Sequence, residues 1–188
     1  MIGEAILFLL DALLQPFAAI LLLRFHLQWL RAPMRNPLGE FIMTLTDFLV
    51  LRARRFIPSV KGLDTASLLL AFVVEAIYVT AMLWVQGFLS SGFPLPGLLV
   101  WTVVKLLKLS IYLLIIALIA EVVLSWVNPR TPVAGLLAAV TRPFVMPLRR
   151  RIPPLGNIDL TPLVLLILCQ LILILPIGWL ERMATGLH

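Results

Sequence analysis

A basic motif occurs twice in this sequence, and its repetition limits the folds that are open to the chain. Residues 46–58 (TDFLVLRARRFIP) align without a gap with residues 141–153 (TRPFVMPLRRRIP). Each copy follows a long apolar segment that ends near a tryptophan, Trp29 or Trp126, and precedes another apolar segment. Because repetition at a fixed spacing indicates a duplicated structural unit, we interpret the chain as two tandem copies of span, basic loop and span.

Composition places this duplicated unit in a membrane. The 188 residues are 62% hydrophobic and only 13% charged, and a soluble domain of that length has too little interior to bury so much apolar surface. The net charge of +6 is attributed to loops at the lipid headgroups rather than to nucleic-acid binding. The lone cysteine, Cys169, excludes an internal disulfide, and neither a metal site nor a cofactor is predicted.

Four apolar segments are long enough to cross a bilayer as helices, which takes about 20 residues. They are residues 4–27, 66–89, 107–127 and 161–180. The first is interpreted as a span rather than a signal peptide, because no basic region precedes it. The stretch 98–108 either extends the third helix into the headgroups or lies along the interface.

Basic residues are concentrated between the spans of each copy. Residues 28–65 and 127–160 hold 11 of the 15 Lys and Arg residues, whereas the Gly-, Pro- and Ser-rich linker 90–97 holds none. Because cytoplasmic loops are enriched in Lys and Arg, both basic loops are predicted to be cytoplasmic and both termini periplasmic. Lys105 and Lys108, near the outer end of the third span, oppose this orientation slightly.

The predicted fold is therefore an all-α membrane protein with four transmembrane helices in two tandem parallel repeats. Residues 1–89 form the first repeat, residues 90–97 the linker and residues 98–188 the second repeat. Since each repeat has two spans, the repeats share one orientation and are related by an axis along the membrane normal.

Each basic loop is expected to contain a short amphipathic helix in the cytoplasmic interface. Asn36-Pro37 and Thr131-Pro132 read as an N-cap followed by proline at the first helical position, and apolar residues recur at helical spacing after both. Pro143 and Pro147 are expected to break the second of these helices. Arginines near the end of each loop are candidates to bind lipid phosphates or a partner, or they only fix the topology; they are Arg54, Arg55, Arg149, Arg150 and Arg151.

Other motif residues are assigned structural roles. These are Trp29, Pro58 and Asp64 in the first copy and Trp126, Pro153 and Asp159 in the second. Each aspartate precedes the second span of its repeat, where a helix N-cap is the favoured interpretation. The alternative is an ion pair with the arginines of the same repeat.

Four ionisable residues lie within apolar runs, where they mark interior faces by default: Asp11, Arg24, Glu75 and Glu121. Arg24 lies five residues before Trp29, and Glu121 lies five residues before Trp126. One hypothesis is an ion pair between them across the repeat axis. The alternative is that Arg24 extends to the headgroups while Glu121 makes local hydrogen bonds.

Glu75 and Asp11 could form a small cation or proton site, although a structural polar contact between helices is the favoured interpretation. Pro16 is expected to kink the first span. The sequence has no nucleotide-binding loop, paired metal ligands or Ser/His/Asp set. An enzyme is therefore not predicted.

The two copies share a set of motifs that cover nearly the whole chain. In the first copy they are Arg24-x-x-x-Gln28-Trp29, Asn36-Pro37, Arg54-Arg55-x-Ile57-Pro58 and Gly62-x-Asp64. In the second they are Ser125-Trp126, Asn128-Pro129, Thr141-x-Pro143, Pro147-Leu148-Arg149-Arg150-x-Ile152-Pro153, Gly156-x-x-Asp159 and Thr161-Pro162. This pattern resembles the YggT family of bacterial inner-membrane proteins (YlmG in cyanobacteria and chloroplasts), in its two-repeat proteobacterial form. The chain departs from the family pattern in two ways. The first copy lacks the prolines after Thr46 and before Arg54. In the second copy, Glu121 stands where the family often has arginine or a neutral residue.

The resemblance implies a function only in outline. Enterobacterial members are associated with osmotic tolerance and potassium uptake, Gram-positive relatives with cell-division genes, and plastid relatives with haem attachment to cytochrome b6. The first hypothesis is a non-enzymatic inner-membrane protein that contributes to osmotic stress tolerance or potassium homeostasis by acting through anionic lipids or partner proteins. The alternatives are a small oligomeric ion channel or transporter subunit, and an assembly factor for cell-division or cytochrome complexes.

Overall fold

The computed structural model describes residues 2–60, 62–88, 95–152 and 159–185. Within these ranges every named element is a helix. The first half of the chain forms α1 (Ile2–Trp29), α2 (Pro37–Ala53) and α3 (Thr65–Val85). The second half forms α4 (Leu95–Val127), α5 (Pro132–Arg149), α6 (Thr161–Ile172), the π-helical turn η1 (Leu173–Ile177) and α7 (Gly178–Thr185).

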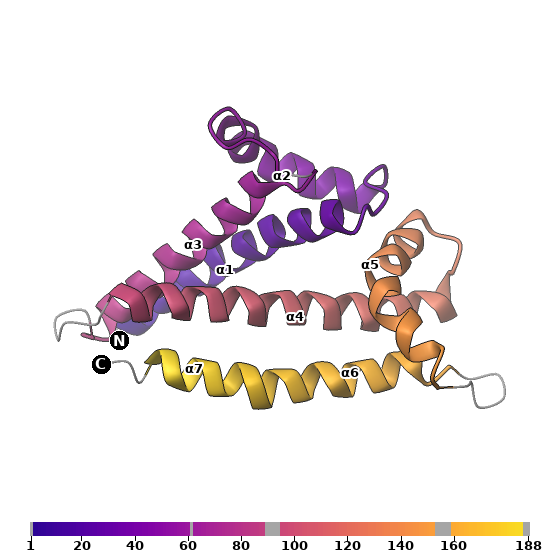
Figure 1. Ribbon diagram of the computed structural model, residues 1–188. Coiled ribbons are helices and arrows are strands. Elements are labelled where there is room, and N and C mark those ends of the chain that lie inside the picture. The colour runs from indigo at the N-terminus through magenta and orange to yellow at the C-terminus, as the bar shows by residue number, and fades with distance from the viewer. Residues whose placement is uncertain (1, 61, 89–94, 153–158, 186–188) are drawn as a thin grey trace.

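Four of the helical segments are long and apolar enough to cross a membrane: Gly3–Trp29, Thr65–Val85, Leu95–Val127 and Thr161–Ala184. The chain is thus a multi-pass membrane protein with an all-α fold, as predicted. In Figure 1 both termini lie at the same end of the molecule, and the short helices α2 and α5 lie away from them. Each half of the chain follows the same order of long helix, short helix and long helix.

The short helices begin where the sequence predicts. The Asn36 side chain accepts a hydrogen bond from the Gly39 amide at 3.0 Å, and Pro37 occupies the first turn. The Thr131 side chain accepts from the Ala134 amide at 3.2 Å, with Pro132 after it. These side chains satisfy amide groups that the first turn of a helix leaves without a partner.

Proline interrupts the helices less than predicted. The prediction that Pro143 and Pro147 break the second short helix is wrong, because α5 continues through both to Arg149. Each proline removes one backbone hydrogen bond, but the apolar face that includes Leu136, Val140 and Val145 is buried, and this packing offsets the loss. Pro16 also lies inside α1, which runs unbroken from Ile2 to Trp29, and the kink expected there stays a prediction.

The ends of three predicted spans also change. α3 ends at Val85 rather than at residue 89, and Gly87 follows with a φ of +80°. α4 begins at Leu95, so the stretch 98–108 extends the third span and residues 95–97 of the predicted linker are helical; residues 90–94 lie outside the described residues. The fourth span runs on through a π-helical turn that contains Pro176, where the missing amide and the bulky ring favour a wider turn.

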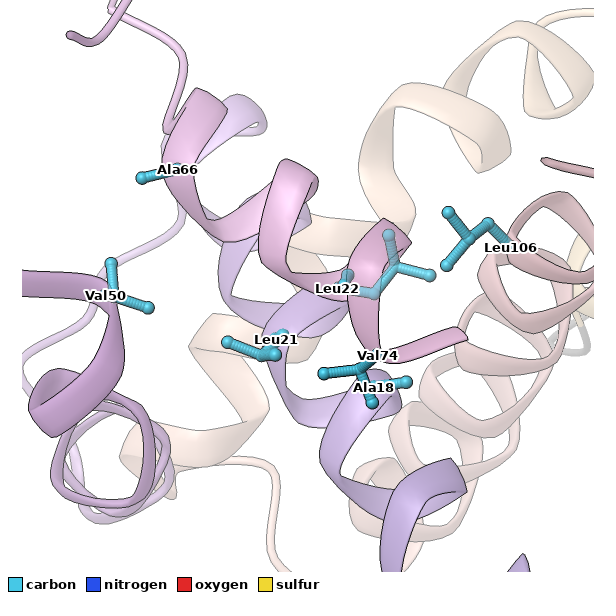
Figure 2. Packing of buried hydrophobic residues seen from close by; sticks show 8 residues of the cluster. Ala18, Leu21, Leu22, Val50, Ala66, Val74 and Leu106 are labelled. Carbon is cyan, nitrogen blue, oxygen red and sulfur yellow. The ribbon is translucent and has the colours of Figure 1, made fainter. Parts of the chain in front are cut away.

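The apolar core lies between the long helices and beneath the short ones. Figure 2 shows side chains from α1, α2, α3 and α4 converging in one cluster, which includes Leu21, Val50, Val74 and Leu106. A second cluster joins α1 and α2 to α4 and α5 across the two halves, and includes Leu27, Ile42, Ala117, Leu136 and Val140. The second cluster holds the two short helices together near the C-terminal ends of α1 and α4.

Candidate functional site

Four charged residues and a threonine of the first half form a partly buried cluster, which we call the three-helix ion cluster. Its members are Arg24 on α1, Thr46 and Asp47 on α2, Arg54 after α2, and Asp64 before α3. Arg24 is only 3% exposed. Its Nη1 donates to Thr46 Oγ1 at 2.6 Å and to Asp47 Oδ1 at 2.7 Å, and its Nε lies 3.6 Å from Asp64 Oδ2. Because a buried charge is costly unless it is paired, these contacts determine how α2 sits on α1.

Asp64 connects this cluster to the start of α3. Its carboxylate accepts from Arg54 Nη2 at 2.7 Å, from Arg54 Nε at 3.2 Å and from Ser67 Oγ at 2.5 Å. It also accepts from the Ser67 amide, so Asp64 is the N-cap of α3. Burial alone would raise the pKa of Asp64, but the hydrogen bonds from Arg54 and Ser67 outweigh it and lower this pKa. Both interpretations of Asp64, helix cap and partner of Arg54, therefore apply together.

The second half repeats this arrangement with more exposure. Arg149 forms an ion pair with Asp159, and the Asp159 carboxylate accepts from the Thr161 amide at 2.9 Å. These hydrogen bonds to Thr161 and Arg149 lower the pKa of Asp159 against the raising effect of burial. The N-cap role predicted for Asp159 is therefore wrong, because the N-cap of α6 is Leu160, which has no side-chain capping bond.

The predicted ion pair between Arg24 and Glu121 does not form. Arg24 bonds to Thr46 and Asp47, whereas Glu121 accepts from Thr141 Oγ1 at 2.5 Å. Each residue therefore turns toward the short helix of its own repeat. Spacing along a helix does not determine which neighbour a side chain faces, and that is why sequence symmetry suggested the wrong partner.

Asp47 was missed by the sequence reasoning although the sequence carries a signal for it. Thr46 and Thr141 occupy the same place in the repeated motif, and the residue after each is Asp47 or Arg142. This change of sign mirrors the change from Arg24 to Glu121. This paired inversion points to Asp47 as the partner of Arg24, although the same signal would pair Glu121 with Arg142, and Glu121 instead bonds to Thr141.

A second polar group, the intraspan cluster, lies between α1, α3 and α4 and consists of Asp11, Gln15, Glu75, Tyr78 and Lys105. Tyr78 Oη donates to Asp11 Oδ1 at 2.6 Å, and Gln15 Nε2 donates to Glu75 Oε1 at 3.0 Å. Lys105 Nζ lies 5.4 Å from the centre of the Tyr78 ring, within range of a cation–π interaction. Glu75 is only 1% exposed.

The structure thus brings Asp11 and Glu75 to the same interface, as their shared location in apolar runs suggested. Sequence reasoning missed Gln15 and Tyr78 as their hydrogen-bond donors and treated Lys105 only as a topological charge. Among the described residues, no group of three or more His, Cys, Asp or Glu side chains is arranged to hold a metal ion.

The remaining predicted site residues lie at the surface or outside the described part. Arg55, Arg150 and Arg151 are exposed, and Trp29 and Trp126 are 53% and 82% exposed. The Pro58 carbonyl accepts from Thr65 Oγ1 at 2.7 Å, which connects the end of the first basic loop to α3. Pro153 lies outside the described residues.

Comparison with known proteins gives one consistent result. The family model of CCB3/YggT matches residues 3–85 and 100–180. An uncharacterized protein of Pseudomonas aeruginosa is 37% identical over 188 residues, covering 99% of this chain and 94% of the relative. An uncharacterized protein of Escherichia coli K12 named YggT is 32% identical over 166 residues, covering 88% and 85%, respectively.

A third relative, from Vibrio alginolyticus and also uncharacterized, is 33% identical over 165 residues, covering 85% of this chain and 86% of the relative. No solved structure shows a significant match. The family model covers most of the chain, and these relatives are aligned over most of their own length. On this ground the chain belongs to the CCB3/YggT family.

Proposed function

We propose that this protein is a non-enzymatic component of the bacterial inner membrane that supports osmotic stress tolerance or potassium homeostasis. It acts by binding anionic lipids or partner proteins at its basic segments. The observation that carries the proposal is the exposure of Arg55, Arg150 and Arg151, while Arg54 and Arg149 are held by aspartates of their own repeats. Exposed arginines close to the ends of spans attract anionic headgroups and acidic protein surfaces.

The orientation that this proposal needs places the basic segments in the cytoplasm and both termini in the periplasm. The concentration of Lys and Arg between the spans supports it. Alkaline phosphatase fused after Thr185 is expected to be active, and the same enzyme fused after Arg130 inactive. The opposite pattern would overturn the proposed orientation.

The physiological part is tested in a bacterial strain that lacks its own YggT-family gene. A variant with Arg55, Arg150 and Arg151 changed to glutamine should fail to restore growth at high osmolarity, whereas the wild-type chain should restore it. Arg182→Gln is the matched control, since Arg182 lies at the other end of the fourth span. Equal growth with wild type and the triple variant would contradict a role for the basic surface. Proteins that co-purify with wild type only would direct attention to a partner, including a division or cytochrome complex.

The intraspan cluster favours a second candidate, a small ion-conducting subunit. Two acids, a lysine and two further polar side chains meet between helices that can span a membrane, and intramembrane ionisable residues commonly mark ion pathways. The test is potassium flux into liposomes that hold the purified protein, with Glu75→Gln and Glu121→Gln as variants. Flux that either substitution abolishes would support conduction, and flux equal to that of empty liposomes would exclude autonomous conduction.

A further inference from the structure

An apolar groove lies between the inner halves of α1 and α3 and the middle of α4. Its volume is about 750 Å³, and its walls include Phe25 and Trp29 of α1, Leu68 and Phe72 of α3, and Leu107 and Ser110 of α4. All of these residues belong to segments that can cross a membrane. A groove in such a position is accessible to hydrocarbon chains of the surrounding lipid.

A polar pocket of about 500 Å³ lies at the same end of α1 and α3 as the groove walls Trp29, Ile57 and Thr65. It is lined by Gln28, Arg54, Pro58, Ser59, Gly62, Leu63 and Asp64. Three pairs of consecutive residues contribute one member to each space: Gln28 and Trp29, Ile57 and Pro58, and Asp64 and Thr65. The hydrogen bond from Thr65 Oγ1 to the Pro58 carbonyl joins two of these segments. The two spaces therefore share three stretches of backbone, at the end of α1, in the basic loop and at the start of α3.

The polar pocket carries a hydrogen-bond donor that suits a phosphate. Arg54 is 37% exposed, and its Nε and Nη2 donate to Asp64. Within the described residues its Nη1 has no partner, which leaves N–H groups to donate to an anion. Arg24 and Arg54 balance the charges of Asp47 and Asp64. The surplus positive charge of this loop comes from Arg52 and Arg55, which are close to Arg54 in the sequence and exposed.

We propose that the groove and the polar pocket together bind one anionic diacyl phospholipid. An acyl chain occupies the groove between α1, α3 and α4, and the phosphate accepts hydrogen bonds from Arg54 with Arg55 nearby. The proposal deepens the proposed function, on which it rests, by naming one class of ligand and its site. A second apolar groove of about 500 Å³ along α3, between Phe72 and Trp84, shares no stretch of chain with the polar pocket and is not proposed as a site.

The experiment counts the phospholipids that the purified protein retains from nanodiscs of equal phosphatidylglycerol and phosphatidylcholine, by native mass spectrometry. Wild type should retain phosphatidylglycerol about fivefold more than phosphatidylcholine, the preference that one arginine contact near a surface supports. Leu107→Trp fills the groove and should abolish the retained lipid. Ala76→Trp fills the second groove and should leave retention unchanged.

Arginine variants test the headgroup contact. Arg55→Gln should reduce the preference for phosphatidylglycerol, and Arg54→Lys should do the same while keeping a positive charge beside Asp64, so that the protein still folds. Equal retention of the two lipids by wild type would overturn the proposal. An equal loss of retention in Leu107→Trp and Ala76→Trp would overturn it as well.

Growth at high osmolarity separates this inference from the proposed function. If Leu107→Trp loses the lipid but restores growth, the lipid site stands and is not needed for osmotic tolerance. If wild type shows no lipid preference while the triple arginine variant still fails to restore growth, the lipid site is wrong and the role of the basic surface stands.

Discussion

Gly39 shows how a single residue controls the entry to α2. A Cβ atom added at this position would lie 2.2 Å from the carbonyl oxygen of Met34, closer than any real contact. A glycine-to-alanine substitution inside a helix usually stabilises the helix. A loss of stability at Gly39 would therefore show that the close approach to Met34 outweighs this gain. We predict that Gly39→Ala lowers the stability of the detergent-solubilised protein by about 1–3 kcal/mol, measured by thermal unfolding.

The matched control is Gly135→Ala in α5, where an added Cβ would meet nothing within 4 Å. This change is expected to leave stability unchanged or to increase it. If the Gly39→Ala protein is as stable as wild type, the backbone at Met34 can move away from α2 without a measurable loss of stability.

Asp64 is the residue on which the three-helix ion cluster depends. Asp64→Asn removes the negative charge between Arg24 and Arg54 and leaves a buried guanidinium less well paired. Breaking a buried ion pair in this way costs about 3 kcal/mol, and we expect a loss of that order in thermal unfolding. Asp159→Asn is the control in the other repeat, and because Asp159 and Arg149 are 34% and 54% exposed, its effect should be below about 1 kcal/mol.

The lowered pKa of Asp64 also predicts a dependence of stability on pH. Its folded-state pKa lies below the ordinary value of 3.8, so the ionised carboxylate stabilises the fold at neutral pH. That contribution is lost as the pH falls below the ordinary value and through the folded-state pKa. Thermal unfolding between pH 7 and pH 3 should show wild type losing more stability than Asp64→Asn, and parallel losses would contradict this role.

At the scale of whole elements, the ends of α1 and α3 use the same turn with different residues. After α3, the amides of Gly87 and Phe88 donate to the carbonyls of Trp84 and Leu83, at 3.1 and 3.0 Å. After α1, the corresponding amides of Arg31 and Ala32 donate to Gln28 and Leu27, at 3.1 and 2.9 Å. This is the Schellman arrangement, in which the first residue beyond the cap adopts a left-handed conformation: φ is +80° at Gly87 and +52° at Arg31.

This comparison predicts opposite effects for two substitutions. Arg31→Gly should raise stability by about 0.5–1 kcal/mol, since glycine adopts this conformation without a steric penalty. Gly87→Ala should lower stability by a similar amount. Thermal unfolding of both variants checks the pair, and a loss of stability in Arg31→Gly would show that its side chain makes a contact that outweighs the backbone cost.

Sequence patterns predicted which elements exist better than where they end. The spans, the short helices and the caps at Asn36 and Thr131 follow from apolar periodicity and cap chemistry, which are local properties. Pro143 and Pro147 were misjudged because tertiary packing of α5 outweighs a local penalty. The second span is predicted to residue 89 because the apolar run continues through Phe88 and Leu89, although a glycine near the end of a helix is a stop signal.

For the whole molecule, the sequence located the ionisable residues and offered the partners of Asp64 and Asp159, but it did not give the partners of Arg24 and Glu121. The rotation of α1 about its own axis decides whether Arg24 faces Asp47 or Glu121. That rotation depends on packing against other helices, which the sequence of α1 alone does not determine. The intraspan cluster was foreseen only as far as Asp11 and Glu75, because Lys105 comes from the other repeat. Its approach to Tyr78 depends on how α4 lies against α3.

The packing of α4 against α1 and α3 predicts that the two repeats assemble when they are made as separate chains. Residues 1–92 and 93–188, co-expressed, should co-purify and restore growth at high osmolarity in the deletion strain, because the apolar clusters that join the halves need no covalent link. Co-purification of the two chains in detergent, with an affinity tag on one, measures this. Fragments that are each stable but never associate would contradict it.

The ion pairs described above have a consequence for how this protein can change over evolutionary time. Arg24 pairs with Asp47, Arg54 with Asp64, Arg149 with Asp159 and Lys108 with Glu181, and every pair stays within one copy of the duplicated unit. After the duplication, either copy could reverse the sign of its buried charge without a compensating mutation in the other. Arg24 bonds to Asp47 in one copy, whereas Glu121 at the same place in the other copy bonds to Thr141, so the two copies already differ in this way.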